Sequence, residues 1–186
     1  MALLVMDELL QLSEMERFED WLAHLKILTR KLGYSNFLIG LKPAPTDANQ
    51  QVLIYSDYPD AWRTRYDAES YAAVDPVVQH CLNANRPLLW DRDNYRRPSE
   101  SEFFEEAAAH GLQQGLALPL HGPRGEAGML CLKPSESGPR ATATMIESLP
   151  MATLLRDYAR EGMLRARIEC STPVHLTSRE QEVLQW

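Results

Sequence analysis

Apolar residues recur at helical spacing over residues 3–32, which predicts a helical segment at the start of the chain. The residues on its apolar face are Phe18, Trp21, Leu22, Leu25, Leu28 and Leu32. Gly33 follows directly and predicts the end of this segment, because glycine readily adopts the left-handed conformation that closes many helices.

Short apolar runs bounded by turn-forming residues predict strands farther along the chain. The expected strands cover residues 35–41, 51–56, 88–90, 115–122 and 126–133. The loop PAPTDANQ separates the first two, and the turn HGPRGE joins the last two as a hairpin.

Helical patterns fill the intervals. They cover residues 59–70, 75–85, 98–111 and 142–167. Pro59 and the pair Asp75-Pro76 each open a helix, with Asp75 as the N-cap and Pro76 in the first turn. We expect a serine to cap the helix over 98–111, Gly111 to end it, and Pro150 to interrupt the last helix.

The strand over 115–122 carries large side chains on one face and small ones on the other. Leu116, Leu118 and Leu120 point one way, whereas Gly115, Ala117 and Pro119 point the other. A sheet that is apolar on both faces must be covered on both. The small face leaves volume for a ligand, although larger side chains from facing helices would fill it equally well and are favoured by this pattern alone.

Composition indicates one domain with a short piece of a second. A net charge of −7 repels nucleic acid at long range, so these residues are not expected to form a nucleic-acid module. No stretch is apolar enough to span a membrane, and the N-terminus indicates an amphipathic helix rather than a signal peptide. Three widely spaced cysteines do not indicate a disulfide framework, so we expect a cytoplasmic location.

Tyr58, Trp62 and Tyr66 are four residues apart, so they form one aromatic stripe on the helix over 59–70. Such a stripe is more often a piece of core than a binding surface. Asp75 follows this stripe in the sequence. Its place before Pro76 fits an ordinary helix N-cap as well as a ligand-binding role. Buried phenol and indole groups nevertheless need hydrogen-bond partners, which a ligand could supply.

Five stretches of the chain resemble LuxR-type quorum-sensing receptors, most closely those of the LasR type, and the first four fall in the ligand-binding domain. They are KLGYSNFLIGLKP, YPDAWRTRYDAESYAAVDPVVQHC, EFFEEAAAHGL, GLALPLHGPRGE and LTSREQEVLQW. Positions typical of the family are present as Trp62, Tyr66, Asp75, Pro76, Trp90 and Gly115. The resemblance implies an α/β fold, an α-β-α sandwich with a central antiparallel sheet of about five strands and helices on both faces.

The resemblance also implies the roles of the site residues toward an N-acyl-homoserine lactone. Trp62 would donate to the lactone carbonyl, Tyr58 would donate to the amide carbonyl, and Asp75 would accept from the amide N–H. Arg63 would bind a 3-oxo group through water, or it forms a structural salt bridge. The remaining wall residues would be Trp90, Phe103, Ala107 and Leu112 at the ring, and Leu38, Gly40, Val52, Ile54, Tyr66 and Val78 at the tail.

Four positions depart from the LasR pattern. Hydroxyl residues are replaced by Val77, Ala117 and Cys131, and Met129 stands where a smaller residue is usual. Each lost hydrogen bond is worth roughly 1 kcal/mol. We therefore expect a tolerant or shifted preference for the acyl chain.

By resemblance, residues 1–168 form the autoinducer-binding domain, 169–175 a linker, and 176–186 the first helix of a helix-turn-helix domain. The recognition helix is absent, so DNA would be bound only through the missing part. We expect the lactone to stabilise the fold and a homodimer to form through the helix over 142–167. No metal, catalytic residue or cofactor other than the signal ligand is expected.

Two other classes of function are an enzyme and a binding module for something other than a lactone. An enzyme acting on the same signal is disfavoured, because the chain has neither a His-x-His-x-Asp-His signature nor a Gly-x-Ser-x-Gly elbow. Adjacent His80 and Cys81 would point in different directions on a helix. A sensor of a non-lactone small molecule, or a ligand-independent dimerisation module, stays open because of the lost hydroxyl groups.

Overall fold

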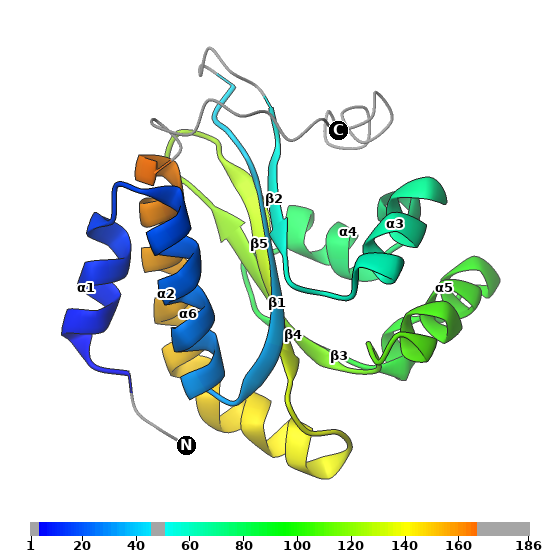
Figure 1. The fold of residues 1–186 in the computed structure, drawn as a ribbon. Coiled ribbons are helices and arrows are strands. Elements are labelled where there is room, and N and C mark those ends of the chain that lie inside the picture. The colour runs from blue at the N-terminus through cyan, green and yellow to red at the C-terminus, as the bar shows by residue number, and fades with distance from the viewer. Residues whose placement is uncertain (1–3, 46–50, 167–186) are drawn as a thin grey trace.

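A computed structural model of the chain describes residues 4–45 and 51–166. The expected linker over 169–175, the expected helix over 176–186 and Cys170 lie outside the described residues. Figure 1 shows a central sheet with one group of helices on each face. The expected α-β-α sandwich is confirmed.

The sheet has five strands in the order β2-β1-β5-β4-β3, and every neighbouring pair is antiparallel. The strands are β1 (Tyr34–Lys42), β2 (Leu53–Ser56), β3 (Leu88–Trp90), β4 (Gly115–His121) and β5 (Ala127–Pro134). β4 and β5 form the expected hairpin, with His121 opposite Ala127. β2 and β3 lie at opposite edges, so side chains from both ends of the sheet can line one broad face.

Three helices cover each face of the sheet (Figure 1). One layer contains α1 (Met6–Glu14), α2 (Phe18–Lys31) and α6 (Pro139–Ala166). The other contains α3 (Asp60–Ala68), α4 (Pro76–Asn83) and α5 (Pro98–Ala109), together with the 3-10 turns η1 (Tyr71–Ala73) and η2 (Arg92–Asn94).

The continuous helical segment expected over residues 3–32 is wrong. Met15 and Arg17 have extended backbone with ψ of 130° and 129°, and they separate α1 from α2. The break lets Leu12 of α1 and Trp21 of α2 enter the same core, although nine residues of continuous helix would place them on opposite faces. Gly33 ends α2 as expected, at φ +93°.

The expected serine cap of α5 is also wrong. Arg97 is the N-cap residue and Pro98 begins the helix. The Glu100 carboxylate accepts the backbone N–H groups of Arg96 and Arg97, each at 2.9 Å, so an acidic side chain inside the first turn satisfies the helix start.

Pro150 lies inside α6 without ending it, so the expected interruption is wrong. The helix begins at Pro139 and continues to Ala166. Figure 1 shows that the yellow part of α6 runs at an angle to the orange part, and a bend is the usual response of a helix to an internal proline.

The leucine face of β4 and β5 packs under α1, α2 and α6, as the sequence predicts. Leu116, Leu118, Leu130 and Leu132 are fully buried there, together with Trp21 of α2. The many fully buried leucines of this cluster form the main hydrophobic core behind the sheet.

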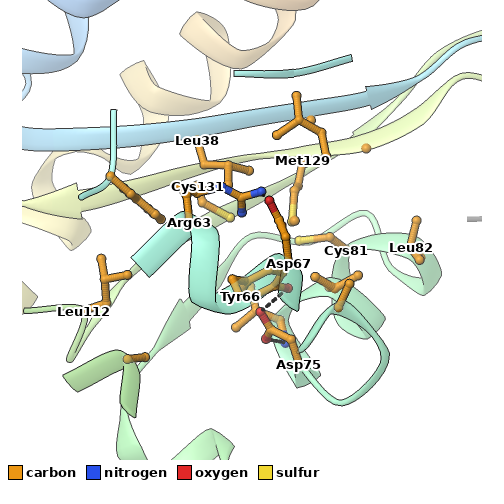
Figure 2. A pocket seen from close by; sticks show the side chains of 18 of the residues that line it. Leu38, Arg63, Tyr66, Asp67, Asp75, Cys81, Leu82, Leu112, Met129 and Cys131 are labelled. Atoms are coloured by element: carbon orange, nitrogen blue, oxygen red, sulfur yellow. Dashed lines mark hydrogen bonds and ion pairs between the residues drawn. The ribbon is translucent and has the colours of Figure 1, made fainter. Parts of the chain in front are cut away.

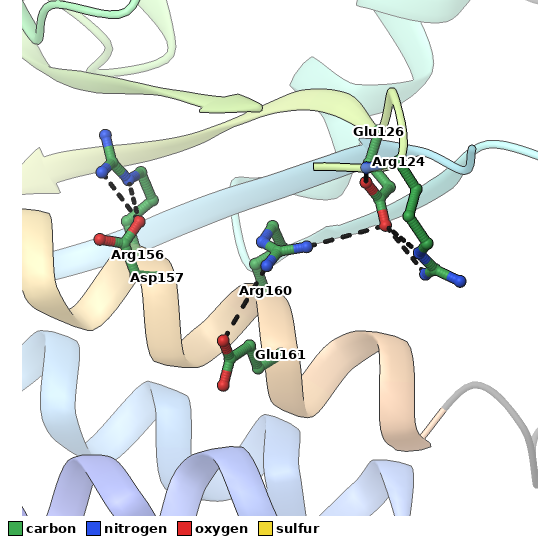
Figure 3. Close-up of polar contacts among 6 residues, drawn as sticks. All are labelled: Arg124, Glu126, Arg156, Asp157, Arg160 and Glu161. Atoms are coloured by element: carbon green, nitrogen blue, oxygen red, sulfur yellow. Dashed lines mark hydrogen bonds and ion pairs between the residues drawn. The ribbon is translucent and has the colours of Figure 1, made fainter. Parts of the chain in front are cut away.

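A buried carboxylate ties the β4–β5 turn to α6. Glu126 accepts the backbone N–H and the guanidinium of Arg124, both at 3.0 Å, and its Oε1 lies 3.8 Å from Nη1 of Arg160 (Figure 3). Burial by itself would raise the pKa of Glu126, but these hydrogen bonds and the charge of Arg124 outweigh it and leave the pKa lowered. The carboxylate therefore stays charged and holds the hairpin against the helix.

Candidate functional site

A cavity of about 140 Å³ lies between the small face of the sheet and the layer of α3, α4 and α5. Its floor comes from β1, β2 and β5, and its roof from α3 and α4 (Figure 2). The side chains around it form a second hydrophobic cluster, separate from the leucine core on the other face. The small face is thus not filled by larger side chains from the helices.

The structure brings the expected site residues together around this cavity. Those that line it are Leu38, Gly40, Val52, Ile54, Tyr58, Trp62, Arg63, Tyr66, Asp75, Val77, Val78, Trp90, Phe103, Ala107, Leu112, Met129 and Cys131. Ala117 does not line it: this residue is fully buried, with Leu88 and Cys131 as its partners across the sheet.

Several wall residues were not expected from the sequence. They are Leu41, Lys42, Asp67, Ala72, Cys81, Leu82, Tyr95, Ala127 and Gly128. Tyr95 is the largest of them and follows η2, which the sequence pattern did not predict. Its ring lies 5.7 Å from that of Phe103 and 4.9 Å from that of Phe104, so its place depends on α5 packing that sequence spacing does not reveal.

Two hydrogen-bond donors of the cavity wall are buried without a partner in the part of the chain that the structure describes. They are the Tyr58 hydroxyl and Nε1 of Trp90. Burial raises the pKa of Tyr58 well above its ordinary value, so the phenol keeps its proton and remains a donor. Leaving such groups unpaired costs about 1–3 kcal/mol each, which an acceptor on a bound molecule would recover.

Asp75 supplies the acidic group of the cavity. One carboxylate oxygen accepts the backbone N–H of Val77 at 2.8 Å, which confirms the expected N-cap of α4. The other accepts the Tyr66 hydroxyl at 3.2 Å (Figure 2). Burial raises the pKa of Asp75 to about 6, against the lowering effect of these hydrogen bonds. The backbone N–H of Val78 is a third donor to this carboxylate, so one of its four lone pairs remains for another donor.

Arg63 forms a salt bridge within α3. Its Nη2 lies 2.8 Å from Oδ1 of Asp67, four residues farther along the helix, and its guanidinium lies over the Tyr66 ring at 5.2 Å. Both members of the pair line the cavity. The salt-bridge interpretation is therefore observed, and it leaves the guanidinium at the cavity wall.

Aromatic rings surround Trp62 of α3. The Trp62 ring lies 6.0 Å from that of Tyr71 in a stacked arrangement, 5.6 Å from Phe103 and 5.8 Å from Tyr66. Trp62 is only 3% exposed. The rings that contact the Trp62 indole come from α3, η1 and α5, so side chains of three elements fix its position.

Gly115 makes room for Trp90. The two residues are paired across β3 and β4, and a Cβ at position 115 would lie 2.6 Å from Cζ2 of Trp90 and 2.8 Å from the Leu132 carbonyl oxygen. Any side chain would force the indole away from the strand. This requirement explains why glycine and tryptophan occur together at these positions.

Two thiols complete the apolar wall. Cys81 of α4 and Cys131 of β5 are buried and free. Burial raises the pKa of Cys81 to about 12 and that of Cys131 well above its ordinary value. Both remain protonated, weakly polar groups rather than nucleophiles. Within residues 4–45 and 51–166, no cluster of His, Cys, Asp and Glu could hold a metal ion.

The model of the autoinducer binding domain family matches residues 17–162. The chain belongs to this family. It is therefore an autoinducer-binding domain of a LuxR-type quorum-sensing regulator, as the resemblance in the sequence implies.

Curated relatives agree with this membership. The domain is 30% identical to the transcriptional activator AnoR of Acinetobacter nosocomialis over 170 residues, covering 87% of this chain and 69% of that protein. It is 29% identical to the transcriptional activator VanR of Vibrio anguillarum over 160 residues, covering 86% of this chain and 67% of that protein. These relatives are named as transcriptional regulators and not as enzymes.

Solved structures share the fold. A crystal structure of SdiA from Escherichia coli matches 97% of this chain and 75% of its own, with a TM-score of 0.71 and 24% identity. The LuxR family transcription factor CepR2 of Burkholderia cenocepacia matches 87% of this chain and 94% of its own, with a TM-score of 0.71 and 20% identity. No helix in the described part of the domain is long and apolar enough to cross a membrane.

Proposed function

We propose that this autoinducer-binding domain binds an N-acyl-homoserine lactone in its cavity and does no chemistry on it. The observation that carries the proposal is an apolar cavity whose described wall holds two unpartnered donors and the buried carboxylate of Asp75. An acyl amide with a lactone ring offers acceptors for the donors, an N–H for the carboxylate and a tail for the apolar wall.

Each polar group has a matching role. The Tyr58 hydroxyl donates to the amide carbonyl, and the remaining lone pair of Asp75 accepts the amide N–H. The Trp62 indole donates to the lactone carbonyl. The tail lies along the aliphatic wall formed by Leu38 and Ile54, on strands β1 and β2.

The size of the cavity determines how binding proceeds. About 140 Å³ is comparable to the roughly 150 Å³ cavity that accepts benzene, and a long acyl lactone is larger than benzene. The layer of α3, α4 and α5 must therefore move outward to admit the ligand. Burying each methylene contributes about 0.8 kcal/mol, so a long tail offsets this movement.

Thermal unfolding with and without lactone tests the proposal. At a free concentration one hundred times Kd, a ligand stabilises the folded state by about 2.7 kcal/mol, which raises Tm by about 5–11 °C for a chain of this size. The control is the ring-opened acyl homoserine, whose charged carboxylate costs much more to bury in an apolar cavity than the neutral lactone ring. If no lactone of any tail length raises Tm, the proposal is wrong. Recovery of intact lactone afterwards separates binding from catalysis.

An acyl glycerol is a second candidate ligand. A structure of SdiA, 24% identical to this chain with a TM-score of 0.70, was solved in complex with octanoyl-rac-glycerol. The apolar residues Val77 and Cys131 at the wall would tolerate a head group other than a lactone. Competition between octanoyl-rac-glycerol and N-octanoyl-homoserine lactone decides between them: the lactone should displace the glycerol ester, because only the lactone carries an amide N–H for Asp75.

We further propose that the domain acts within a longer regulator. The chain covers 63–69% of the length of the first four curated relatives. Residues 169–175 are proposed to be a linker, and residues 176–186 the start of a helix-turn-helix domain. α6 is proposed to mediate a homodimer in the cytoplasm. Sedimentation with and without lactone tests the dimer, which should strengthen when the ligand is bound.

A further inference from the structure

Two charged side chains join α3 to α5 over the cavity wall. Nε of Arg65 donates to Oε2 of Glu106 at 2.8 Å, and Nη2 of Arg65 donates to Oε1 at 3.1 Å. The Tyr71 hydroxyl donates a further hydrogen bond to the same carboxylate. Paired hydrogen bonds between a guanidinium and a carboxylate fix their relative orientation as well as their distance. We name this pair, Arg65 and Glu106, the α3–α5 strap.

The strap lies on the solvent side of a seam in the cavity wall. Inside the seam, the Phe103 ring of α5 lies 5.6 Å from the Trp62 ring and 5.9 Å from the Tyr66 ring of α3. These three residues line the cavity. The side chains of Arg65 and Glu106 are 45% and 38% exposed, so they close the same seam from outside. Figure 1 shows both helices on the same face of the sheet, where ring contacts and the ion pair hold them together.

The third helix of this layer is held against the sheet instead. Nε2 of His121 on β4 lies 3.0 Å from the Cys81 carbonyl oxygen and 3.2 Å from the Ala84 carbonyl oxygen, in the last turn and at the C-cap of α4. α4 also packs on β4 and β5. The proposed function requires the layer to move outward when a ligand enters. The seam between α3 and α5 is where the layer can part while α4 stays in place.

We infer that the α3–α5 strap controls entry to the cavity: it breaks when α3 and α5 part, and it forms again when they close over the ligand. This inference rests on the proposed function, because it concerns how the lactone reaches the cavity. The charges of the strap lie on the solvent side of the wall. The strap therefore controls how fast the ligand passes and not how tightly it is held.

A contact that controls entry has a kinetic signature that a ligand-binding residue lacks. The strap is present in the closed domain with and without ligand and is lost on opening, so it makes opening less frequent in both cases. Removing it raises the rate constants for association and dissociation by the same factor and leaves Kd unchanged. For an exposed ion pair this factor is about two- to fivefold.

Glu106→Gln tests this role in the 186-residue chain, because it removes the charge of the strap and keeps the shape of the side chain. Glu69→Gln is the matched control: Glu69 accepts from Nη1 of Arg65 at 2.7 Å, but it is the C-cap of α3 and does not cross the seam. Association of N-decanoyl-homoserine lactone is followed by stopped-flow tryptophan fluorescence, and dissociation of the radiolabelled lactone by a chase with unlabelled lactone. Both rate constants should rise in Glu106→Gln, and neither should change in Glu69→Gln.

Salt provides a second test on the unmodified chain. The lactone is neutral, so ionic strength does not steer it to the domain. Between about 0.1 M and about 1 M NaCl the Debye length falls from about 10 Å to about 3 Å, which weakens an exposed ion pair. The dissociation rate constants of the unmodified chain and Glu106→Gln should therefore converge as NaCl is added. A difference that persists undiminished at 1 M NaCl overturns the role of the strap.

The outcomes separate this inference from the proposed function. Unchanged rate constants in Glu106→Gln, or equal increases in Glu69→Gln, overturn the role of the strap and leave lactone binding intact. A rise in the dissociation rate constant alone also overturns it, since that result assigns Glu106 to holding the bound ligand. Failure of the unmodified chain to bind the lactone overturns both.

Discussion

Replacing Asp75 by Asn removes the acidic group from the wall of the cavity and should abolish a pH dependence of stability. Burial raises the pKa of Asp75 from 3.8 to about 6 in the folded domain. The folded state therefore binds more protons than the unfolded state between these values, so stability falls as pH rises through this window. At 1.36 kcal/mol for each pH unit, the loss between pH 4 and pH 7 is about 3 kcal/mol.

The assay is urea unfolding of the wild-type chain and Asp75→Asn at several pH values between 4 and 7.5. Asparagine keeps an oxygen that can accept the Val77 N–H, so the N-cap of α4 is preserved. Other titrating groups contribute equally to both proteins and cancel in the difference. The free energy of unfolding of wild type minus that of Asp75→Asn should fall by about 3 kcal/mol over this range.

A constant difference across the range would refute this reasoning, because it would mean that Asp75 titrates alike in the folded and unfolded states.

The dependence of lactone binding on pH supplies a second test of the same group. An amide N–H that donates to Asp75 favours the charged carboxylate. Stabilisation by lactone should therefore be greater at pH 7.5 than at pH 5 in the wild type, and independent of pH in Asp75→Asn.

Three further substitutions have defined outcomes. Tyr58→Phe removes an unpartnered hydroxyl, so urea unfolding of the free domain should show no loss of stability while calorimetry shows lactone affinity reduced about three- to tenfold; a destabilised free domain would contradict the assignment. Gly115→Ala should cost about 1–3 kcal/mol of stability, because its Cβ would lie 2.6 Å from Trp90, whereas in Gly40→Ala the Cβ finds its nearest neighbour at 3.9 Å and unfolding should change less. Glu126→Gln should cost about 1–2 kcal/mol in the same assay near pH 7 and less below pH 4, where the wild-type carboxylate also becomes protonated.

Residue periodicity predicts most of this fold because the two faces of the sheet differ in the sequence itself. Leu116 and Leu118 alternate with Gly115 and Ala117, and the structure places the first pair against α2 and α6 and the second pair toward α3, α4 and α5. Periodicity does not predict where one helix ends and the next begins. The break at Met15 shifts the buried face by about half a turn between Leu12 and Trp21, but the many apolar residues at the start of the chain obscure this shift in the sequence.

The cavity was predictable in part, and the limit has a physical cause. The spacing of Tyr58, Trp62 and Tyr66 places three rings on one helix face, but only tertiary packing brings α5 and η2 around them. Tyr95 was missed for this reason. The resemblance implies Ala117 as a site residue and alternation places it on the small face, yet it does not line the cavity, since alternation fixes the face of a sheet and not the depth of the cavity.

The difference between the two cores suggests why a domain of this kind can report the presence of a small molecule. The leucine core between the sheet and α1, α2 and α6 is filled and holds its own stability. The other layer encloses a void, two unpaired donors and a buried carboxylate, each of which destabilises the free domain. A ligand that fills the void and pairs these groups removes all three penalties at once. We therefore expect the stability of α3, α4 and α5 to depend on the proposed ligand far more than that of α6, through which the proposed dimer would form.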